Sequence, residues 1–312
     1  MVAAGEAAQG TRHMRTYRMR NFRTIVTMVM IPATCAVLAG CGAQWQASKL
    51  TRLDGFGTPE SVCVAPWTGE VFVSNIMIAP TGDDSRWDAA DGTGFISRLG
   101  PGARGGKIKW VQSTTAAPLN STKGVCAFND VLYVADVVCV RRISIPTGKT
   151  LKPIVITGAK SLNDVACDGK YVYVSDTVTG KIHRIDGDKH TVISEVTSAN
   201  GLACSDGKMF CASWVLHEIF EVDPTGKTEP IPFGLAGKLV GLDGIVAMPD
   251  GKLLISDLRG GKILLVGTDR KTVRTLIEID RPADIAVDHA RGLLYIPTLD
   301  RDAVFVYRLW KE

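Results

Sequence analysis

Four side chains with a polar oxygen occupy the same place in a repeated five-residue motif. They are the first residues of segments whose third position is aliphatic and whose fourth and fifth are Ala, Val or Cys: Glu60, Asn163, Asn200 and Asp243. Two carboxylates and two amide carbonyls are ligands that hard divalent cations, Ca²⁺ above all, prefer, with waters completing the coordination. If the repeats surround one axis, these oxygens converge on a cation site. The alternative is a structural ring of polar residues that cap backbone groups.

The motif occurs six times in the chain. Its first residues are Glu60, Lys123, Asn163, Asn200, Asp243 and Ala283, at spacings of 63, 40, 37, 43 and 40 residues. A period near 40 residues with turn signals is typical of a β-propeller, in which each unit supplies four strands. We therefore predict an all-β fold, a six-bladed β-propeller over residues 49–312.

The third unit illustrates the expected strands. They cover residues 164–167, 171–175, 181–186 and 191–196. Asp-Gly dipeptides at 168–169, 206–207 and 250–251 fall between the first and second strands of their units, where a tight hairpin requires positive φ.

The last unit supplies only three strands. An unpaired strand edge is a liability in a folded protein. Residues 47–53 precede the first unit and have no other partner, so we expect them to pair with the last strand and close the ring.

The first unit contains a long insertion, residues 76–93, between its second and third strands. Such loops lie on the face where the first strands begin, and long loops in compact domains are often functional. The insertion is either a lid that brings Trp87 over the site or a surface loop.

Another column lies at the ends of the second strands, on the same face: Asn75, Asp136, Asp176, Trp214 and Asp257. Capping of the hairpin ends is favoured over a rim of functional residues. Trp214 and Trp87 are nevertheless candidates for binding substrate. Lys123, in the column of expected ligands, could repel a cation or hold a substrate carboxylate.

The basic excess of the chain is local. The formal charge is +4, and five arginines against one glutamate within residues 1–40 account for it. The remainder has equal numbers of acidic and basic residues. Sequence-independent nucleic-acid binding requires clustered Lys and Arg on phosphates, so nucleic acid is not an expected partner. We expect a monomer.

The N-terminus has the pattern of a targeting segment. Basic residues precede an apolar run, residues 25–38, which is short for a bilayer span and suits a signal peptide. The run ends in Leu38-Ala39-Gly40-Cys41, which resembles a bacterial lipobox. We expect a signal peptide over residues 1–40, lipidation of Cys41, a tether over 41–48 and location in the bacterial cell envelope. An ordinary secretory signal or an uncleaved anchor remains the alternative.

Six cysteines follow Cys41. Four of them, Cys63, Cys126, Cys167 and Cys204, occupy the small-residue positions of the motif. An exported compartment permits disulfides, but small buried side chains are the better interpretation. No Cys or His spacing suggests zinc.

The polar column resembles that of the gluconolactonase and regucalcin (senescence marker protein) family. The strings Leu162-Asn163-Asp164, Ala199-Asn200-Gly201 and Leu242-Asp243-Gly244 carry the resemblance, with Glu60 in the first unit. It implies a divalent metal held by Glu60, Asn200 and Asp243. It also implies Asn163 near substrate and Asp243 as catalytic base.

This sequence departs from the pattern of that family at one position. Sugar lactonases of the family carry an Arg two residues before the third-unit Asn, and Ser161 stands there in this chain. Two functions are therefore expected. One is a metal-dependent hydrolase of small-molecule lactones or related esters. The other is a non-catalytic propeller, similar to NHL-type repeats, that binds a cell-envelope protein or glycan.

Overall fold

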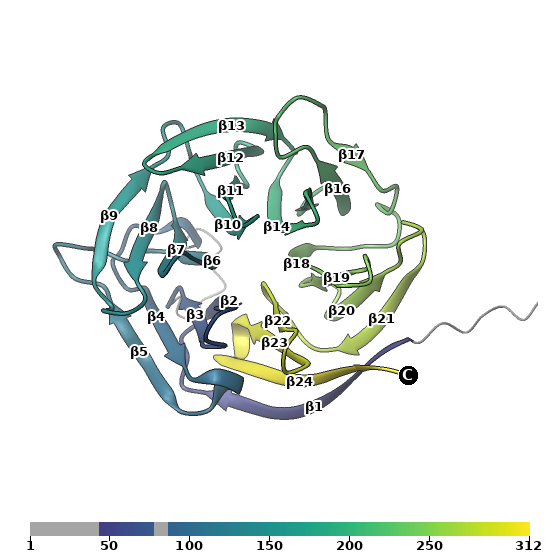
Figure 1. Cartoon of the computed structure of the whole chain (residues 1–312), viewed down its shortest axis with the longest axis horizontal. Coiled ribbons are helices and arrows are strands. Elements are labelled where there is room, and N and C mark those ends of the chain that lie inside the picture. Colours follow the sequence, from purple (N-terminus) through teal and green to yellow (C-terminus); the bar gives the residue numbers. More distant parts are fainter. Residues whose placement is uncertain (1–43, 78–86) are drawn as a thin grey trace, which may run out of the picture. The chain divides into compact units, whose positions relative to one another are not determined.

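Short strands rich in Val, Ile and Leu, joined by turns, make up most of the chain that the structure describes. A computed structural model describes residues 44–77 and 87–312. In these residues, 24 strands form six four-stranded antiparallel sheets. The sheets surround one axis, each with one strand innermost (Figure 1). The prediction of an all-β, six-bladed β-propeller is confirmed.

The first three blades contain consecutive strands, numbered from the axis outward. Blade 1 contains β2 (Pro59–Val64), β3 (Val71–Asn75), β4 (Phe95–Leu99) and β5 (Gly106–Gln112). Blade 2 contains β6 (Thr122–Phe128), β7 (Val131–Asp136), β8 (Cys139–Ser144) and β9 (Thr150–Val155). Blade 3 contains β10 (Leu162–Cys167), β11 (Val172–Asp176), β12 (Lys181–Asp186) and β13 (Lys189–Glu195). The strands predicted for blade 3 match the observed ones to within two residues.

The remaining blades follow the same order. Blade 4 contains β14 (Ala199–Ser205), β15 (Lys208–Ser213), β16 (Glu218–Val222) and β17 (Ile231–Pro232). Blade 5 contains β18 (Leu242–Ala247), β19 (Leu253–Asp257), β20 (Lys262–Val266) and β21 (Val273–Glu278). Blade 6 contains β22 (Ala286–Asp288), β23 (Leu293–Thr298), β24 (Ala303–Lys311) and β1 (Trp45–Asp54). Two short 3₁₀ helices, η2 (Pro101–Ala103) and η3 (Leu299–Arg301), lie in connections.

The outer strand of blade 6 comes from the other end of the described chain. Strand β1 pairs antiparallel with β24, with Trp45 opposite Lys311 and Asp54 opposite Ala303. The expected ring closure is therefore confirmed. The propeller begins at Trp45 rather than at residue 49, so the predicted tether was too long. The error arose because an outer strand is largely exposed and carries little hydrophobic alternation.

The core lies between neighbouring blades. One cluster combines Val140 and Ile154 of blade 2 with Val165, Val174 and Ile185 of blade 3. The predicted Asp-Gly turns are present, with φ of +86° at Gly169, +74° at Gly207 and +77° at Gly251. These turns join the first and second strands of their blades at one face of the propeller. The loops at the opposite ends of these strands form the other face.

The six cysteines from Cys63 to Cys211 are free. The four motif cysteines lie in apolar clusters between blades, which confirms that they serve as small packing side chains. The apolar run 25–38 and Cys41 lie outside the described residues. In the described part of the chain, no helix is long and apolar enough to cross a bilayer.

Candidate functional site

A β-bulge interrupts each of the first five innermost strands at the first two residues of the motif. In β10, Leu162 pairs with Asp176 and Val165 pairs with Val174, so Asn163 and Asp164 together face a single residue. The same register shift occurs in β2, β6, β14 and β18. Bulges re-aim side chains and are common beside active sites. Here they leave the first residue of each motif free of the regular ladder.

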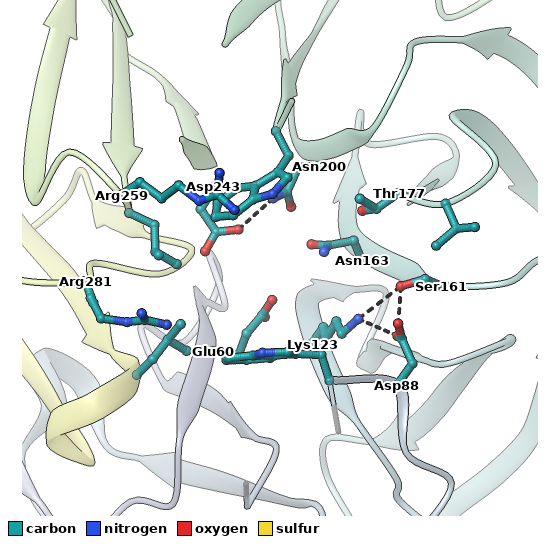
Figure 2. Close-up of a pocket in the computed structure, with 15 residues that line it drawn as sticks. Glu60, Asp88, Lys123, Ser161, Asn163, Thr177, Asn200, Asp243, Arg259 and Arg281 are labelled. Carbon is teal, nitrogen blue, oxygen red and sulfur yellow. Dashed lines mark hydrogen bonds and ion pairs between the residues drawn. The ribbon is translucent and has the colours of Figure 1, made fainter. Parts of the chain in front are cut away.

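All five of these first residues line one pocket: Glu60, Lys123, Asn163, Asn200 and Asp243. The cavity has a volume of about 360 Å³, and its polar side chains point toward a common space (Figure 2). The convergence predicted from the repeat is confirmed for the four oxygen-bearing residues. Because Glu60, Asn200 and Asp243 are at most 5% exposed, they form a buried floor.

Asn200 and Asp243 are held together by a hydrogen bond. The amide Nδ2 of Asn200 donates to Asp243 Oδ1 at 2.9 Å and to the carbonyl of Leu242 at 3.3 Å. This arrangement leaves Asn200 Oδ1 buried without a hydrogen-bond partner, and the same holds for Glu60 Oε2. Buried polar atoms nearly always have partners. Two such acceptors in one pocket are atoms that a bound cation or hydrogen-bond donor would satisfy.

Burial shifts the protonation of both floor carboxyls. Burial and, second, the charge of Asp243 raise the pKa of Glu60 well above its ordinary value. Burial also raises the pKa of Asp243 to about 7, partly offset by the hydrogen bond from Asn200. The charged forms are disfavoured because desolvated carboxylates lie close together. A divalent cation would offset both charges.

Two further buried carboxyl groups, Asp164 and Asp284, interact electrostatically with Glu60 and Asp243, and the repeat alone did not mark them as site residues. Asp164 Oδ2 accepts a hydrogen bond from the Leu202 amide at 2.6 Å, and Asp284 Oδ2 accepts one from Ser61 Oγ at 2.5 Å. The Asp284 amide also donates to the Glu60 carbonyl at 2.9 Å. Each carboxylate thus ties one innermost strand to the next blade. Both residues occupy the second position of the motif, and this is the sequence feature that they share.

Glycine at that second position permits the close approach of neighbouring blades. A Cβ on Gly124 would lie 2.4 Å from the Cα of Asp164, and one on Gly244 would lie 2.7 Å from the Cα of Asp284. A Cβ on Gly201 would lie 2.2 Å from the carbonyl oxygen of Asp243. The glycines and the bulges together bring the first residues into one pocket.

Lys123 has partners inside the pocket. Its Nζ donates to Asp88 Oδ1 at 2.7 Å and to Ser161 Oγ at 3.2 Å, and Ser161 Oγ donates to Asp88 Oδ1 at 2.8 Å (Figure 2). The ammonium group is therefore paired with a carboxylate rather than free to hold a substrate carboxylate. Asp88 belongs to the blade 1 insertion, so this network ties that segment to blades 2 and 3.

The two candidate tryptophans lie at the same pocket. Trp87 and Trp214 both line it and pack against Leu258 and Leu299. The placement of Trp87 favours a role for the insertion at the pocket, although residues 78–86 lie outside the described residues. Arg259 extends over the Trp214 indole, with its guanidinium carbon 4.6 Å from the ring centroid.

The remaining residues of the second-strand column cap backbone groups, as favoured. Asn75 accepts a hydrogen bond from the Gly57 amide, and Asp136 accepts one from Asn120. Asp176 and Asp257 each accept several backbone hydrogen bonds from adjacent loops. Trp214 is the member of the column that faces the pocket. No histidine is among the described residues that line the pocket.

The donor set fits a hard cation better than a soft one. Among the described residues, no group of three His, Cys, Asp or Glu side chains is placed to hold a metal ion. A cation here would therefore depend on two carboxylates, Glu60 and Asp243, together with the Asn200 amide oxygen. Oxygen ligands of mixed charge, completed by water, are typical of Ca²⁺.

Comparisons with models of protein families and with curated proteins find no match. Solved structures share the fold. A candidate gluconolactonase is 16% identical with a TM-score of 0.61, over 87% of this chain and 94% of that one.

Two other similar structures have different activities or partners. Virginiamycin B lyase from Staphylococcus aureus, as a catalytically inactive variant with quinupristin, is 14% identical with a TM-score of 0.60, over 85% of this chain and 99% of that one. A chain of a nidogen/laminin complex is 17% identical with a TM-score of 0.59, over 69% of this chain and 86% of that one.

These identities show the fold alone. The chain is a six-bladed β-propeller with a pocket at its axis whose floor contains two buried carboxyl groups, and its fold matches that of a candidate gluconolactonase. Because propellers support many unrelated activities, a function has to be argued from the pocket.

Proposed function

We propose that this protein is a divalent-cation-dependent hydrolase of lactones or related esters. The observation that carries the proposal is the pair of buried acceptors without partners, Glu60 Oε2 and Asn200 Oδ1, beside the carboxylate of Asp243. The fold shared with a candidate gluconolactonase supports the same reaction class.

In this proposal Glu60, Asn200 and Asp243 hold the cation, which is Ca²⁺ because the three side chains offer only oxygen ligands. A cation bound there would polarise the carbonyl of the substrate and stabilise the charge that develops on its oxygen. The Asn200 amide, anchored by Asp243 Oδ1 and the Leu242 carbonyl, presents its own oxygen to the pocket without further reorganisation.

Asp243 is the proposed general base. Its Oδ1 accepts the hydrogen bond from Asn200, and its second oxygen points into the pocket (Figure 2). That oxygen would take the proton from a water attacking the substrate carbonyl, a role that requires hydrogen-bond reach to the water. Asn163 lines the same pocket and would hold the water or the substrate.

The cation site is tested by thermal melting with and without added Ca²⁺. A ligand present at 100 times its Kd stabilises a protein by about 2.7 kcal/mol. Wild type should gain stability with Ca²⁺, and Glu60→Gln and Asp243→Asn should not. Both variants should stay folded, because burial already favours the neutral forms of these carboxyls. Asp206→Asn, an exposed carboxylate in the turn after β14, is the matched control and should respond like wild type.

Activity is tested on a lactone panel by proton release. Wild type should hydrolyse at least one lactone in a Ca²⁺-dependent manner, and Asp243→Asn should lose about 100-fold or more in kcat, as expected for a general base. Absence of both Ca²⁺ stabilisation and turnover would remove the hydrolase proposal. A non-catalytic binding propeller would then be the better description.

The same proposal includes location. We propose export to the bacterial cell envelope as a monomer anchored through lipidated Cys41. Strand β1 begins near the Asp-Gly turns, where Trp45 Nε1 donates to Asp250 Oδ2 at 3.0 Å. That face is opposite the pocket. Mass spectrometry of the mature N-terminus, and loss of membrane association in Cys41→Ser, test the anchor.

A further inference from the structure

One wall of the pocket is apolar. It consists of Trp87 and Trp214 packed against Leu258 and Leu299. The two leucines are 6% and 4% exposed, so the wall is backed by buried side chains. The Arg259 guanidinium over the Trp214 indole fixes that ring by a cation–π contact. The wall is therefore a built surface rather than scattered exposed side chains.

Another part of the lining is polar, and four of its side chains already have hydrogen-bond partners. Asp88, Lys123 and Ser161 hydrogen-bond to one another at 2.7 to 3.2 Å. Thr177 Oγ1 donates to the carbonyl of Ala199 at 2.8 Å. A ligand rich in hydroxyl groups would have to break these contacts to be recognised by these four side chains. The buried atoms without partners, Glu60 Oε2 and Asn200 Oδ1, lie at the floor.

We infer that the substrate is a lactone or ester with an apolar substituent, and not a sugar lactone. Its carbonyl lies at the floor, and its substituent lies against Trp87, Trp214, Leu258 and Leu299. This inference rests on the proposed function for the position of the carbonyl. Aliphatic or aromatic groups gain from burial against such a wall. Hydroxyl groups placed there lose hydration without gaining partners.

Three lactones that share a six-membered ring test the inference: unsubstituted δ-valerolactone, δ-decalactone with its pentyl chain, and glucono-δ-lactone with its hydroxyl groups. We expect kcat/KM for δ-decalactone to exceed that for the other two by about tenfold or more, since one methylene in an apolar pocket is already worth about tenfold. Trp214→Ala should bring the ratio of kcat/KM for δ-decalactone to kcat/KM for δ-valerolactone close to one. Trp67→Ala is the matched control, because Trp67 is 46% exposed in the turn between β2 and β3, at the opposite face, and should behave as wild type.

Binding is measured separately from turnover by calorimetry with the pentyl-substituted δ-lactam, which hydrolyses far more slowly than the lactone. Binding that is weakened in Trp214→Ala and not in Trp67→Ala supports the inference even if no lactone is hydrolysed, in which case the proposed function alone fails. Hydrolysis of glucono-δ-lactone as fast as that of δ-decalactone would overturn the inference and leave the proposed function in place. Equal behaviour of the two tryptophan variants would also overturn it.

Discussion

Replacing Gly201 by alanine tests the close contact on which the site depends. A Cβ at this position would lie 2.2 Å from the Asp243 carbonyl oxygen and 3.1 Å from the Cα of Gly244. Both contacts are with backbone, which cannot move aside as the end of a side chain can. The innermost strands of blades 4 and 5 would have to separate by roughly 1 Å, and overpacking of this kind costs about 1–3 kcal/mol.

The assay is thermal melting in the presence and absence of Ca²⁺. We expect Gly201→Ala to melt several degrees below wild type, since about 2–4 °C per kcal/mol applies to a domain of this size. The substitution should also weaken stabilisation by Ca²⁺, because it shifts Asp243 relative to Asn200. Gly237→Ala is the matched control: a Cβ there meets nothing within 4 Å, and Gly237 is exposed.

The reasoning is refuted if the two glycine variants melt together and bind Ca²⁺ equally. Blades 4 and 5 would then not approach as closely as the structure shows. In that case the bulge and the glycine could not be the reason that Asn200 and Asp243 share one pocket.

Two further predictions concern stability. Burial and the nearby His190 lower the pKa of His183 to about 4. Neutral His183 therefore contributes to the free energy of unfolding above pH 6.5. This contribution, about 3 kcal/mol at most, is lost as the pH falls from about 6.5 toward 4. His183→Leu should therefore lose less stability than wild type between pH 7 and pH 5 in denaturant titrations, and parallel curves would contradict this. Deleting residues 45–54 removes the strand paired with β24 and should lower the melting temperature by about 10 °C or more, compared with a chain that begins at residue 44. An unchanged melting temperature would show that β1 does not close the ring.

The repeat made the fold and the pocket floor predictable. Every blade contains the same motif, an aliphatic third position followed by small residues. Equivalent residues such as Asn163 and Asn200 are therefore expected at the same position along the propeller axis. The repeated motif does not show why these first residues lie outside the regular pairing of the strands. The bulge depends on which residues of two paired strands face each other, and the sequence gives no direct signal for this register. Glycine at Gly124, Gly201 and Gly244 was the available hint.

The pairing of charges was less predictable than their positions. Lys123 belongs to the repeat, but its partner Asp88 comes from an insertion with no counterpart in other blades, so their contact at 2.7 Å follows from the tertiary structure alone. The sequence does not distinguish the carboxylates of Asp164 and Asp284 from other residues at the second position of the motif. Their burial and their bonds to the next blade depend on how closely the blades approach.

The floor and the walls of the pocket therefore have different origins in the chain. Glu60, Asn200 and Asp243 belong to innermost strands that the repeat and the inter-blade contacts hold rigid. Trp87 and Trp214 belong to connecting segments, which can change without disturbing those strands. A change in the walls would alter which substituent is bound while leaving the floor intact. For this reason a fold shared with a candidate gluconolactonase does not fix which substituent this pocket binds.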